Sequence, residues 1–372
     1  MHLTIERSAL LRSLSHIQSV VEKRNTIPIL SNVQLVAEDG KLSLTATDLD
    51  LAIVEAAACD VVQPGGTTAP AHTLYDIVRK IPDGSQVEFS YNSEDSRLTL
   101  RAGRSEFALS CLPREDFPVM ADDDLPHRFT VTASDLKRLI EKTRFAISTE
   151  ETRYYLNGIY LHTATGGEGA VLRAVATDGH RLARVEIPAP TGAEAVPGII
   201  VPRKTVNEVH KLIEDLDTGV EVALSETKIR FAFDSVVLTS KLIDGTFPDY
   251  ERVIPANNDK LLHVDGKVFA DAVDRVSTIS SEKSRAVKLA LDQDRLVLSA
   301  NSPEQGSATE EVSVEFGGEH LEIGFNSRYL LDITGQIDGD SAQFSLADAA
   351  SPTIIRDAAD DSALYVLMPM RV

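Results

Sequence analysis

The segment ATDGHRLA, residues 176–183, contains the side chains of this sequence that most suggest catalysis. Asp178, His180 and Arg181 are residue types that exchange protons in enzymes. Such chemistry usually needs a nucleophile at a recognisable spacing, and the sequence offers no such partner. Asp-Gly is also a common turn dipeptide. We therefore predict a turn at this segment and no catalytic residue in the chain.

The C-terminal segment YVLMPMRV, residues 365–372, suggests binding rather than catalysis. Met368 and Met370 are two of the four methionines, and Pro369 and Arg371 follow them in turn. Methionine is unbranched and polarizable, so it packs against partners of different shape. Two interpretations stay open: the tail packs inside its own domain, or it borders a groove that other proteins enter.

Composition narrows the class of protein. The chain has 372 residues, with 37 Lys and Arg against 57 Asp and Glu, and a formal charge of −20. An excess of acid ordinarily opposes nucleic-acid binding, so the location of the charge matters more than its sum. Cys59 and Cys111 have no metal-ligand spacing and favour a reducing compartment. With no signal peptide and no membrane-length apolar run, we expect a cytoplasmic protein that has no metal, no cofactor and no membrane partner.

One order of elements occurs three times along the chain. Segments beginning at Leu3, Phe129 and Leu262 each start as a short strand and continue with apolar residues at helical spacing. A hairpin, a second helix, a second hairpin and a final strand follow each time. We predict an α+β fold of three tandem domains, each with two β-α-β-β-β halves. The predicted domains are residues 1–121, 127–253 and 260–372.

Eight segments carry motifs: TIPILSNV (26–33), RYYLNGIYL (153–161), ATDGHRLA (176–183), VPRK (201–204), SKLIDGTFPDYERV (240–253), NSPEQ (301–305), IGFN (323–326) and YVLMPMRV (365–372). With these motifs in this order, the sequence resembles the beta subunits of bacterial DNA polymerase III, the replicative sliding clamps. The resemblance covers essentially the whole chain. It implies a head-to-tail homodimeric ring with sheets outside and helices lining a central hole, which encircles duplex DNA without reading its sequence. It also implies a non-catalytic processivity subunit with a hydrophobic pocket for peptides of the polymerase catalytic subunit, the clamp loader, other polymerases and repair proteins.

The distribution of charge agrees with a central hole that is lined by helices and holds DNA. The predicted helices together carry +4, whereas the whole chain carries −20, so the remaining residues carry −24. In one helix Leu136 and Leu139 lie on an apolar face, and Lys142 lies away from it. The helices can therefore face phosphates while the rest of the surface repels nucleic acid. The predicted helices are residues 8–21, 72–80, 133–146, 203–216, 266–280 and 326–337.

The resemblance also implies which residues act. The peptide pocket joins the ATDGHRLA turn, the segment entering the third domain and the C-terminal tail. Its residues here are Leu156, Thr177, Gly179, His180, Arg181, Leu182, Pro248, Arg252, Val253, Asn326, Tyr329, Val366, Leu367, Met368, Pro369, Met370 and Arg371. The DNA-facing residues are Arg24, Lys137, Arg138, Lys142, Tyr154, Arg203 and Lys204.

The dimer contact joins the first third of one chain to the last third of the other. The matching residues are Arg97, Arg104, Phe107, Leu109, Ile279, Glu304 and Glu310. The alternative that Phe107 and Leu109 only fill the core of their own domain stays open. The sequence departs from the family at Glu106 and His72, where basic residues are frequent, and at Ser284, where some relatives have phenylalanine.

Two other classes of protein fit the sequence less well. A DNA-binding regulator needs a recognition helix with base-reading side chains, and the basic helices follow no helix-turn-helix pattern. An enzyme needs a convergent polar site, and none emerges from the motifs. The chain also has no GxxxxGK[ST] phosphate loop, so opening of the ring is expected to need a separate ATP-driven loader.

Overall fold

The computed structural model describes residues 1–121, 124–167, 169–280 and 285–371. Ser284 and Val372 lie outside the described residues. The chain forms two compact units, which are described separately. The first comprises Met1–Ser134 and Asn207–Leu242, and the second comprises Asp135–Val206 and Ile243–Val372.

The predicted threefold order of elements is confirmed. The first repeat runs β1 (His2–Glu6), α1 (Arg7–Gln18), β2 (Asn32–Glu38), β3 (Lys41–Thr47), β4 (Leu51–Ala58), β6 (Gly65–Pro70), α2 (Ala71–Val78), β7 (Gln86–Asn92), β8 (Arg97–Ala102) and β9 (Ser105–Ser110). A short strand that the sequence did not predict, β5 (Asp60–Gln63), lies between its halves.

The later repeats keep this order. The second runs β10 (His127–Thr132), α3 (Ala133–Arg144), β11 (Gly158–Gly166), β12 (Gly169–Thr177), β13 (Arg181–Pro188), β14 (Ile199–Pro202), α4 (Arg203–Leu212), β15 (Gly219–Leu224), β16 (Lys228–Phe233) and β17 (Val236–Lys241). The third runs β18 (Lys260–Asp265), α5 (Gly266–Ser277), β19 (Ala286–Leu291), β20 (Arg295–Ser302), β21 (Gly306–Ser313), β22 (Glu315–Phe316), β23 (Leu321–Asn326), α6 (Ser327–Thr334), β24 (Ser341–Leu346), β25 (Thr353–Asp357) and β26 (Asp360–Leu367).

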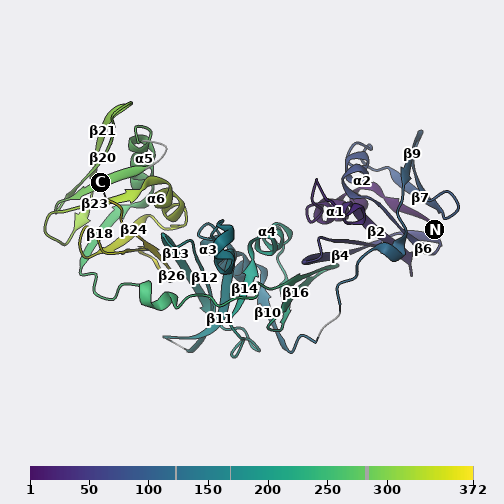
Figure 1. Cartoon of the computed structure of the whole chain (residues 1–372), viewed down its shortest axis with the longest axis horizontal. Coiled ribbons are helices and arrows are strands. Elements are labelled where there is room, and N and C mark those ends of the chain that lie inside the picture. Colours follow the sequence, from purple (N-terminus) through teal and green to yellow (C-terminus); the bar gives the residue numbers. More distant parts are fainter. Residues whose placement is uncertain (122–123, 168, 281–284, 372) are drawn as a thin grey trace. The chain divides into compact units, whose positions relative to one another are not determined.

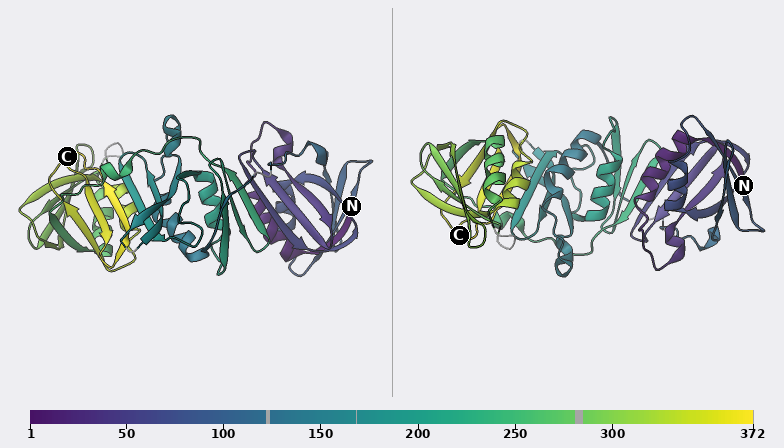
Figure 2. Two further views of the ribbon diagram at one scale, coloured as in Figure 1. Left: turned by 90° about the horizontal axis from the view of Figure 1, so that it is seen from below. Right: turned by 90° about the horizontal axis from the view of Figure 1, so that it is seen from above.

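Helices cover one face of the sheets in each unit. Helix α1 lies beside α2 in the first unit, and α5 lies beside α6 in the second (Figure 1). Within the second unit, strands lie in front in the left view of Figure 2 and helices lie in front in the right view. Leu10, Leu14 and Ile17 of α1 are fully buried, as expected for an apolar stripe that packs on a sheet.

Side chains at the helix starts explain where several helices begin. The Glu6 carboxylate accepts a hydrogen bond from the backbone N–H of Ala9, and Asp265 accepts one from Val268 at 2.8 Å. These acceptors satisfy N–H groups that the first helical turn leaves without partners. The strand-to-helix steps at α1 and α5 are therefore encoded locally.

The sheets continue across the junctions between repeats. In the first unit, β4 of the first repeat pairs with β17 of the second, in a sheet of order β10-β15-β16-β17-β4-β3-β2-β6. In the second unit, β13 of the second repeat pairs with β26 of the third, in a sheet of order β14-β11-β12-β13-β26-β25-β24-β18-β22. Each compact unit is therefore built around one junction, and the units do not coincide with the repeats.

Two strands end the remaining sheets. Strand β9 is the last strand of the sheet β5-β1-β7-β8-β9, and β21 is the first strand of the sheet β21-β20-β19-β23. In repeat order, β9 corresponds to β17 and β26, and β21 corresponds to β4 and β13. Strands β9 and β21 therefore occupy the repeat positions that pair with each other at both junctions, but each is a terminal strand of its own sheet.

One expectation about α3 is wrong. Leu136, Leu139 and Ile140 are buried as predicted, but Lys142 is buried too, with its side chain only 9% exposed. Its ammonium group lies 2.6 Å from the Asp338 carboxylate and also donates to the Gln336 carbonyl. The long aliphatic stem of lysine lets the chain bury while its charge is paired, so helical spacing alone misassigned it.

Candidate peptide-binding site

The ATDGHRLA segment forms the turn that the sequence predicts. The Thr177 hydroxyl donates to the Arg181 carbonyl at 2.7 Å and accepts from the Gly179 N–H at 3.1 Å. One Asp178 carboxylate oxygen accepts from the N–H groups of His180 at 2.9 Å and Arg181 at 3.0 Å. The Asp178 carboxylate that suggested acid–base chemistry is therefore occupied in holding the turn.

The first repeat contains the same turn. The Thr47 hydroxyl donates to Leu51 and accepts from Leu49, and Asp48 accepts from Asp50 and Leu51. The third residue of each turn has positive φ, 81° at Leu49 and 89° at Gly179. Glycine adopts this conformation without the steric cost that leucine bears. A glycine also suits the second turn because a Cβ there would lie 2.7 Å from Arg153 Nη1.

Arg181 connects this turn to helix α6. Its guanidinium lies 3.2 Å from the Asp178 carboxylate, pairs with Asp332 and donates to the Phe145 carbonyl at 2.7 Å. It also lies 4.3 Å from the centre of the Tyr329 ring, an attractive cation–π geometry. The other neighbour of that ring is exposed His180, stacked at 6.3 Å.

The C-terminal tail leaves strand β26 beside this turn. The Met368 N–H donates to the His180 carbonyl, and the Met370 N–H donates to the Gly324 carbonyl, both at 2.9 Å. Residues 363–367 of β26 are buried, whereas Met368 is 42% exposed. The tail is thus fixed by its backbone while its methionines stay accessible.

An apolar floor lies next to the tail. It is made by buried Leu156, Leu182 and Val366, which belong to one cluster with Phe247 and Tyr250 of the segment that enters the third repeat. Around it, Val253 is half exposed, Pro248 is exposed, and Arg252 is exposed and pairs with Asp249. A floor of this kind with soft side chains at its rim suits an apolar peptide.

The structure brings most of the predicted pocket residues together, with differences in role. Leu367 is fully buried and points to the opposite face of β26 from Val366, and its place in the pocket wall stays a prediction. Thr177 and Arg181 are buried within the turn and shape the wall through it. Asn326 caps α6 by accepting from the N–H groups of Arg328 and Tyr329.

Several residues of the floor were missed by the sequence reasoning. The apolar cluster also contains residues from β12, β14, β25 and β26 and from the segment before the third repeat. These are Val175, Ile200, Phe247, Tyr250, Ile354 and Leu364. The motif SKLIDGTFPDYERV held a signal for two of them, because its Phe and Tyr are large apolar rings in an otherwise polar segment.

A polar cluster lies beyond the floor. Arg173 pairs with Glu186 and Glu251, each at 2.9 Å, and donates to the Tyr250 hydroxyl at 2.9 Å. That hydroxyl also lies 3.0 Å from His162 Nε2. Burial lowers the pKa of His162 and raises the pKa of Tyr250. Burial therefore favours the neutral form of both groups.

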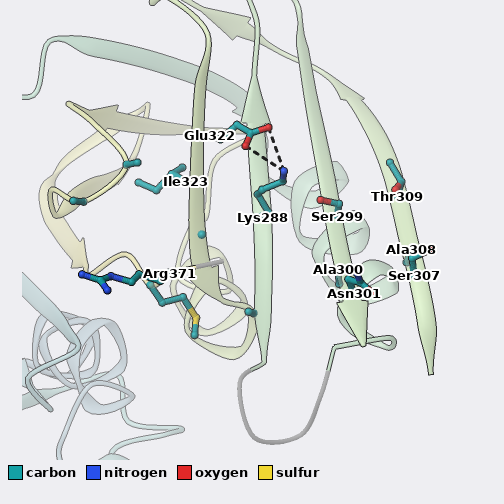
Figure 3. Close-up of a pocket in the computed structure, with 15 residues that line it drawn as sticks. Lys288, Ser299, Ala300, Asn301, Ser307, Ala308, Thr309, Glu322, Ile323 and Arg371 are labelled. Carbon is teal, nitrogen blue, oxygen red and sulfur yellow. Dashed lines mark hydrogen bonds and ion pairs between the residues drawn. The ribbon is translucent and has the colours of Figure 1, made fainter. Parts of the chain in front are cut away.

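The C-terminal tail also borders a wide groove of about 860 Å³ (Figure 3). Met370 and Arg371 lie at one end, and strands β23, β19, β20 and β21 form its base. Lys288 and Glu322 pair across neighbouring strands at 3.2 Å. This groove could not be recognised from the sequence, because the residues that line it are mostly small and polar.

The predicted DNA-facing and dimer residues are mostly accessible. Arg24 and Arg203 are exposed, Tyr154 is 54% exposed, and Arg138 is partly exposed while paired with Asp360. Lys137 and Lys204 are half-buried. Among the dimer residues, Arg97, Arg104 and Glu304 are exposed, Phe107 and Ile279 are half-buried, Leu109 is buried, and Glu310 pairs with Arg275 at 2.6 Å.

The described residues form neither a membrane-spanning helix nor a metal-binding cluster. In that part of the chain no helix combines the length and apolar character that crossing a membrane requires. The same residues contain no group of three histidine, cysteine, aspartate or glutamate side chains placed to hold a metal ion.

Comparison with known proteins identifies the family. Residues 1–121, 130–249 and 251–371 match the N-terminal, central and C-terminal domains of the DNA polymerase III beta subunit. The beta sliding clamps of Caulobacter vibrioides and Escherichia coli K12 are 58% and 40% identical to this chain, each over the full length of both proteins.

Solved structures agree with this assignment. The Caulobacter crescentus beta sliding clamp superimposes with a TM-score of 0.98 at 57% identity, covering 100% of this chain and 99% of that one. The Bartonella birtlesii sliding clamp bound to griselimycin gives 0.97 at 51% identity, covering both chains completely. The chain therefore belongs to the DNA polymerase III beta subunit family, the bacterial beta sliding clamps.

Proposed function

We propose that two copies of this chain form a head-to-tail ring around duplex DNA and tether the replicative polymerase to it. The chain performs no chemistry itself. A tether works by raising the effective concentration of the polymerase at the primer end. Because the ring holds DNA by enclosure, it needs only weak contacts with phosphates and can slide.

The pairing of strands across the repeat junctions is the observation that carries this proposal. The same kind of contact joins β4 to β17 and β13 to β26. The corresponding strands β21 and β9 are terminal in their sheets and are available to repeat the contact between two chains. A head-to-tail contact closes into a ring when its rotation allows, and closure protects exposed strand edges. We assign Arg97, Arg104, Phe107, Leu109, Ile279, Glu304 and Glu310 to this contact.

Helix residues and their neighbours supply the surface that faces DNA. The helices carry net positive charge in a chain of −20, which supports this orientation. We assign this role to Arg24, Lys137, Arg138, Tyr154, Arg203 and Lys204. Lys142 is left out because Asp338 and the Gln336 carbonyl already pair with its ammonium group.

We propose that the apolar floor and the tail form the docking pocket for the polymerase, the clamp loader and repair proteins. The exposed Met368 beside buried Leu182 and Val366 supports this role. The rim is Gly179, His180, Pro248, Arg252, Val253, Asn326, Tyr329, Pro369, Met370 and Arg371, with Leu156, Leu182 and Val366 as the floor. Arg181 and Thr177 hold the rim in shape.

Two further assignments accompany this function. We infer that the domains span residues 1–121, 127–253 and 260–372, which agrees approximately with the three matched family segments. We also infer that the protein acts in the cytoplasm, where its DNA and polymerase partners are found.

Deletion of residues 368–372 tests the pocket. The shortened chain is expected to lose binding of the polymerase and of griselimycin, measured by surface plasmon resonance, while light scattering still shows a dimer near twice 40.4 kDa. Met368→Ala is expected to weaken binding, whereas Val268→Ala, a similarly exposed residue of α5, is the matched control and leaves it unchanged. Full binding by the shortened chain would reject the assignment.

A further inference from the structure

Two cross-strand rows lie next to each other on the face of the sheet that carries the apolar floor. In the first row, Leu182 of β13 pairs with Val366 of β26, which pairs with Ile354 of β25. Two residues further along the strands, Arg184 pairs with Leu364. Ile355 of β25 pairs with Tyr365, and the register then shifts before Asp357 pairs with Asp360, so Arg356 faces the irregular stretch of β26 that contains Leu364.

The strands on either side of β26 therefore each carry an arginine near a buried leucine. Leu364 is 1% exposed, and it belongs to the same apolar cluster as Leu182 and Val366. Residues two apart on a strand point to the same face about 7 Å from each other, and neighbouring strands lie about 5 Å apart. Arg184 and Arg356 thus lie at the end of the apolar floor, close enough for the charge of Arg356 to act on Arg184.

Both arginines are incompletely satisfied. Each is half-buried, and each Nε atom is buried without a hydrogen-bond partner among the described residues. Burial lowers the pKa of Arg184, and the charges of Arg173 and Arg356 lower it further. Buried donors that lack an acceptor cost free energy, so a site of this kind gains from an added anion.

The acids nearby are already engaged. Glu186 and Glu251 each lie 2.9 Å from the guanidinium of Arg173, and the Tyr250 hydroxyl accepts from that same group. The three arginines and two glutamates leave a net charge of +1. These two glutamates are therefore already paired with Arg173 rather than with Arg184 or Arg356.

We propose that Arg184 and Arg356 bind the carboxylate of an aspartate or glutamate side chain in a partner polypeptide docked in the adjacent pocket. This proposal rests on the proposed function of that pocket. Continuity with the apolar floor favours a residue flanking the docked peptide over a free small anion. The charge of the chain, −20, repels acidic partners elsewhere, so a local pair of arginines would select for an acid at one position.

Peptide pairs test this assignment. Fluorescent peptides share an apolar core of leucine and phenylalanine and differ in a flanking Glu-Glu or Gln-Gln pair, placed before or after the core. In fluorescence polarisation, the full-length protein is expected to bind one Glu-Glu peptide about tenfold more tightly than its Gln-Gln counterpart, since charge-assisted hydrogen bonds are lost with the glutamates. Rising salt concentration is expected to reduce this preference.

The variant Arg184→Gln/Arg356→Gln is expected to bind the two peptides equally and to keep the wild-type affinity for the Gln-Gln peptide, which also shows that it is folded. The control Lys41→Gln/Arg295→Gln removes the same charge from exposed positions and keeps the preference. Equal binding of both peptides by the wild type, or a preference retained by the arginine variant, would overturn the proposal. If no peptide binds, or if binding survives deletion of residues 368–372, the proposed pocket fails and the arginine site fails with it.

Discussion

The Arg181 side chain links the ATDGHRLA turn to helix α6. It is 9% exposed and joins the Asp178 turn, Asp332 of α6 and the Tyr329 ring through one guanidinium. A charge buried this way is costly unless all its partners are present. Its role is therefore structural, even though the residue type and its neighbours suggested acid–base chemistry.

Replacement of Arg181 by methionine is expected to destabilise the protein by about 3 kcal/mol, because Asp332 is left partly buried without its partner. Urea denaturation measures this change. The control Arg252→Met replaces a side chain that is 84% exposed, and it is expected to leave the unfolding midpoint unchanged. Equal unfolding midpoints for the two variants would show that the Arg181 contacts contribute little.

The sheet elements show what local sequence can and cannot predict. The alternation of apolar residues and the turn dipeptides are local, so they predicted the order of strands and helices in all three repeats. The pairing of β13 with β26 joins segments nearly two hundred residues apart, and no local pattern encodes it. Lys142 was misassigned for a related reason, since Asp338, which pairs with its ammonium group, belongs to a distant segment of the chain.

The candidate site follows the same division. The turn at Asp178 was predicted from residue types. Exposure of Met368 was one of two interpretations that the sequence left open, and the resemblance supplied the association of turn and tail with one pocket. The missed floor residues, such as Ile354, become part of the site only through pairing between β25 and β26. Arg184 and Arg356 likewise meet only across three strands, so each looks like an ordinary surface arginine in the sequence.

Strand β11 contains a pH-sensitive contact with the segment that enters the third repeat. His162 lies 3.0 Å from the Tyr250 hydroxyl, and burial lowers its pKa below the ordinary value of 6.5. As pH falls below 6.5, the unfolded chain binds a proton that the folded chain excludes, so stability is lost. Above 6.5 neither state is protonated and this contribution to stability is fully present.

The variant His162→Gln is expected to show a smaller loss of stability than the wild type as the pH is lowered from 6.5. Guanidinium denaturation at a series of pH values measures the difference. Parallel stability profiles for the two proteins over this range would show that His162 does not carry this pH dependence.

At the scale of the whole molecule, closure of the proposed ring depends on contact between β9 of one chain and β21 of the other. Phe107 of β9 is half-buried in the single chain and is available to pack against the last third of a second chain. Phe107→Asp is expected to convert the dimer into a 40.4 kDa monomer in light scattering. Val62→Asp, on the opposite edge strand β5 of the same sheet, is the control and leaves the dimer intact. A dimer that tolerates both substitutions would place the contact elsewhere.

Retention on DNA distinguishes a ring that encloses DNA from a protein that holds DNA by affinity. After loading by a clamp loader, the labelled protein is washed in high salt on closed circular DNA and on the same DNA cut once. Enclosure predicts that the protein stays on the circle, because salt screens phosphate contacts without opening the ring, and that it slides off the cut molecule. Equal loss from both forms would mean that the protein holds DNA by affinity and would contradict the account.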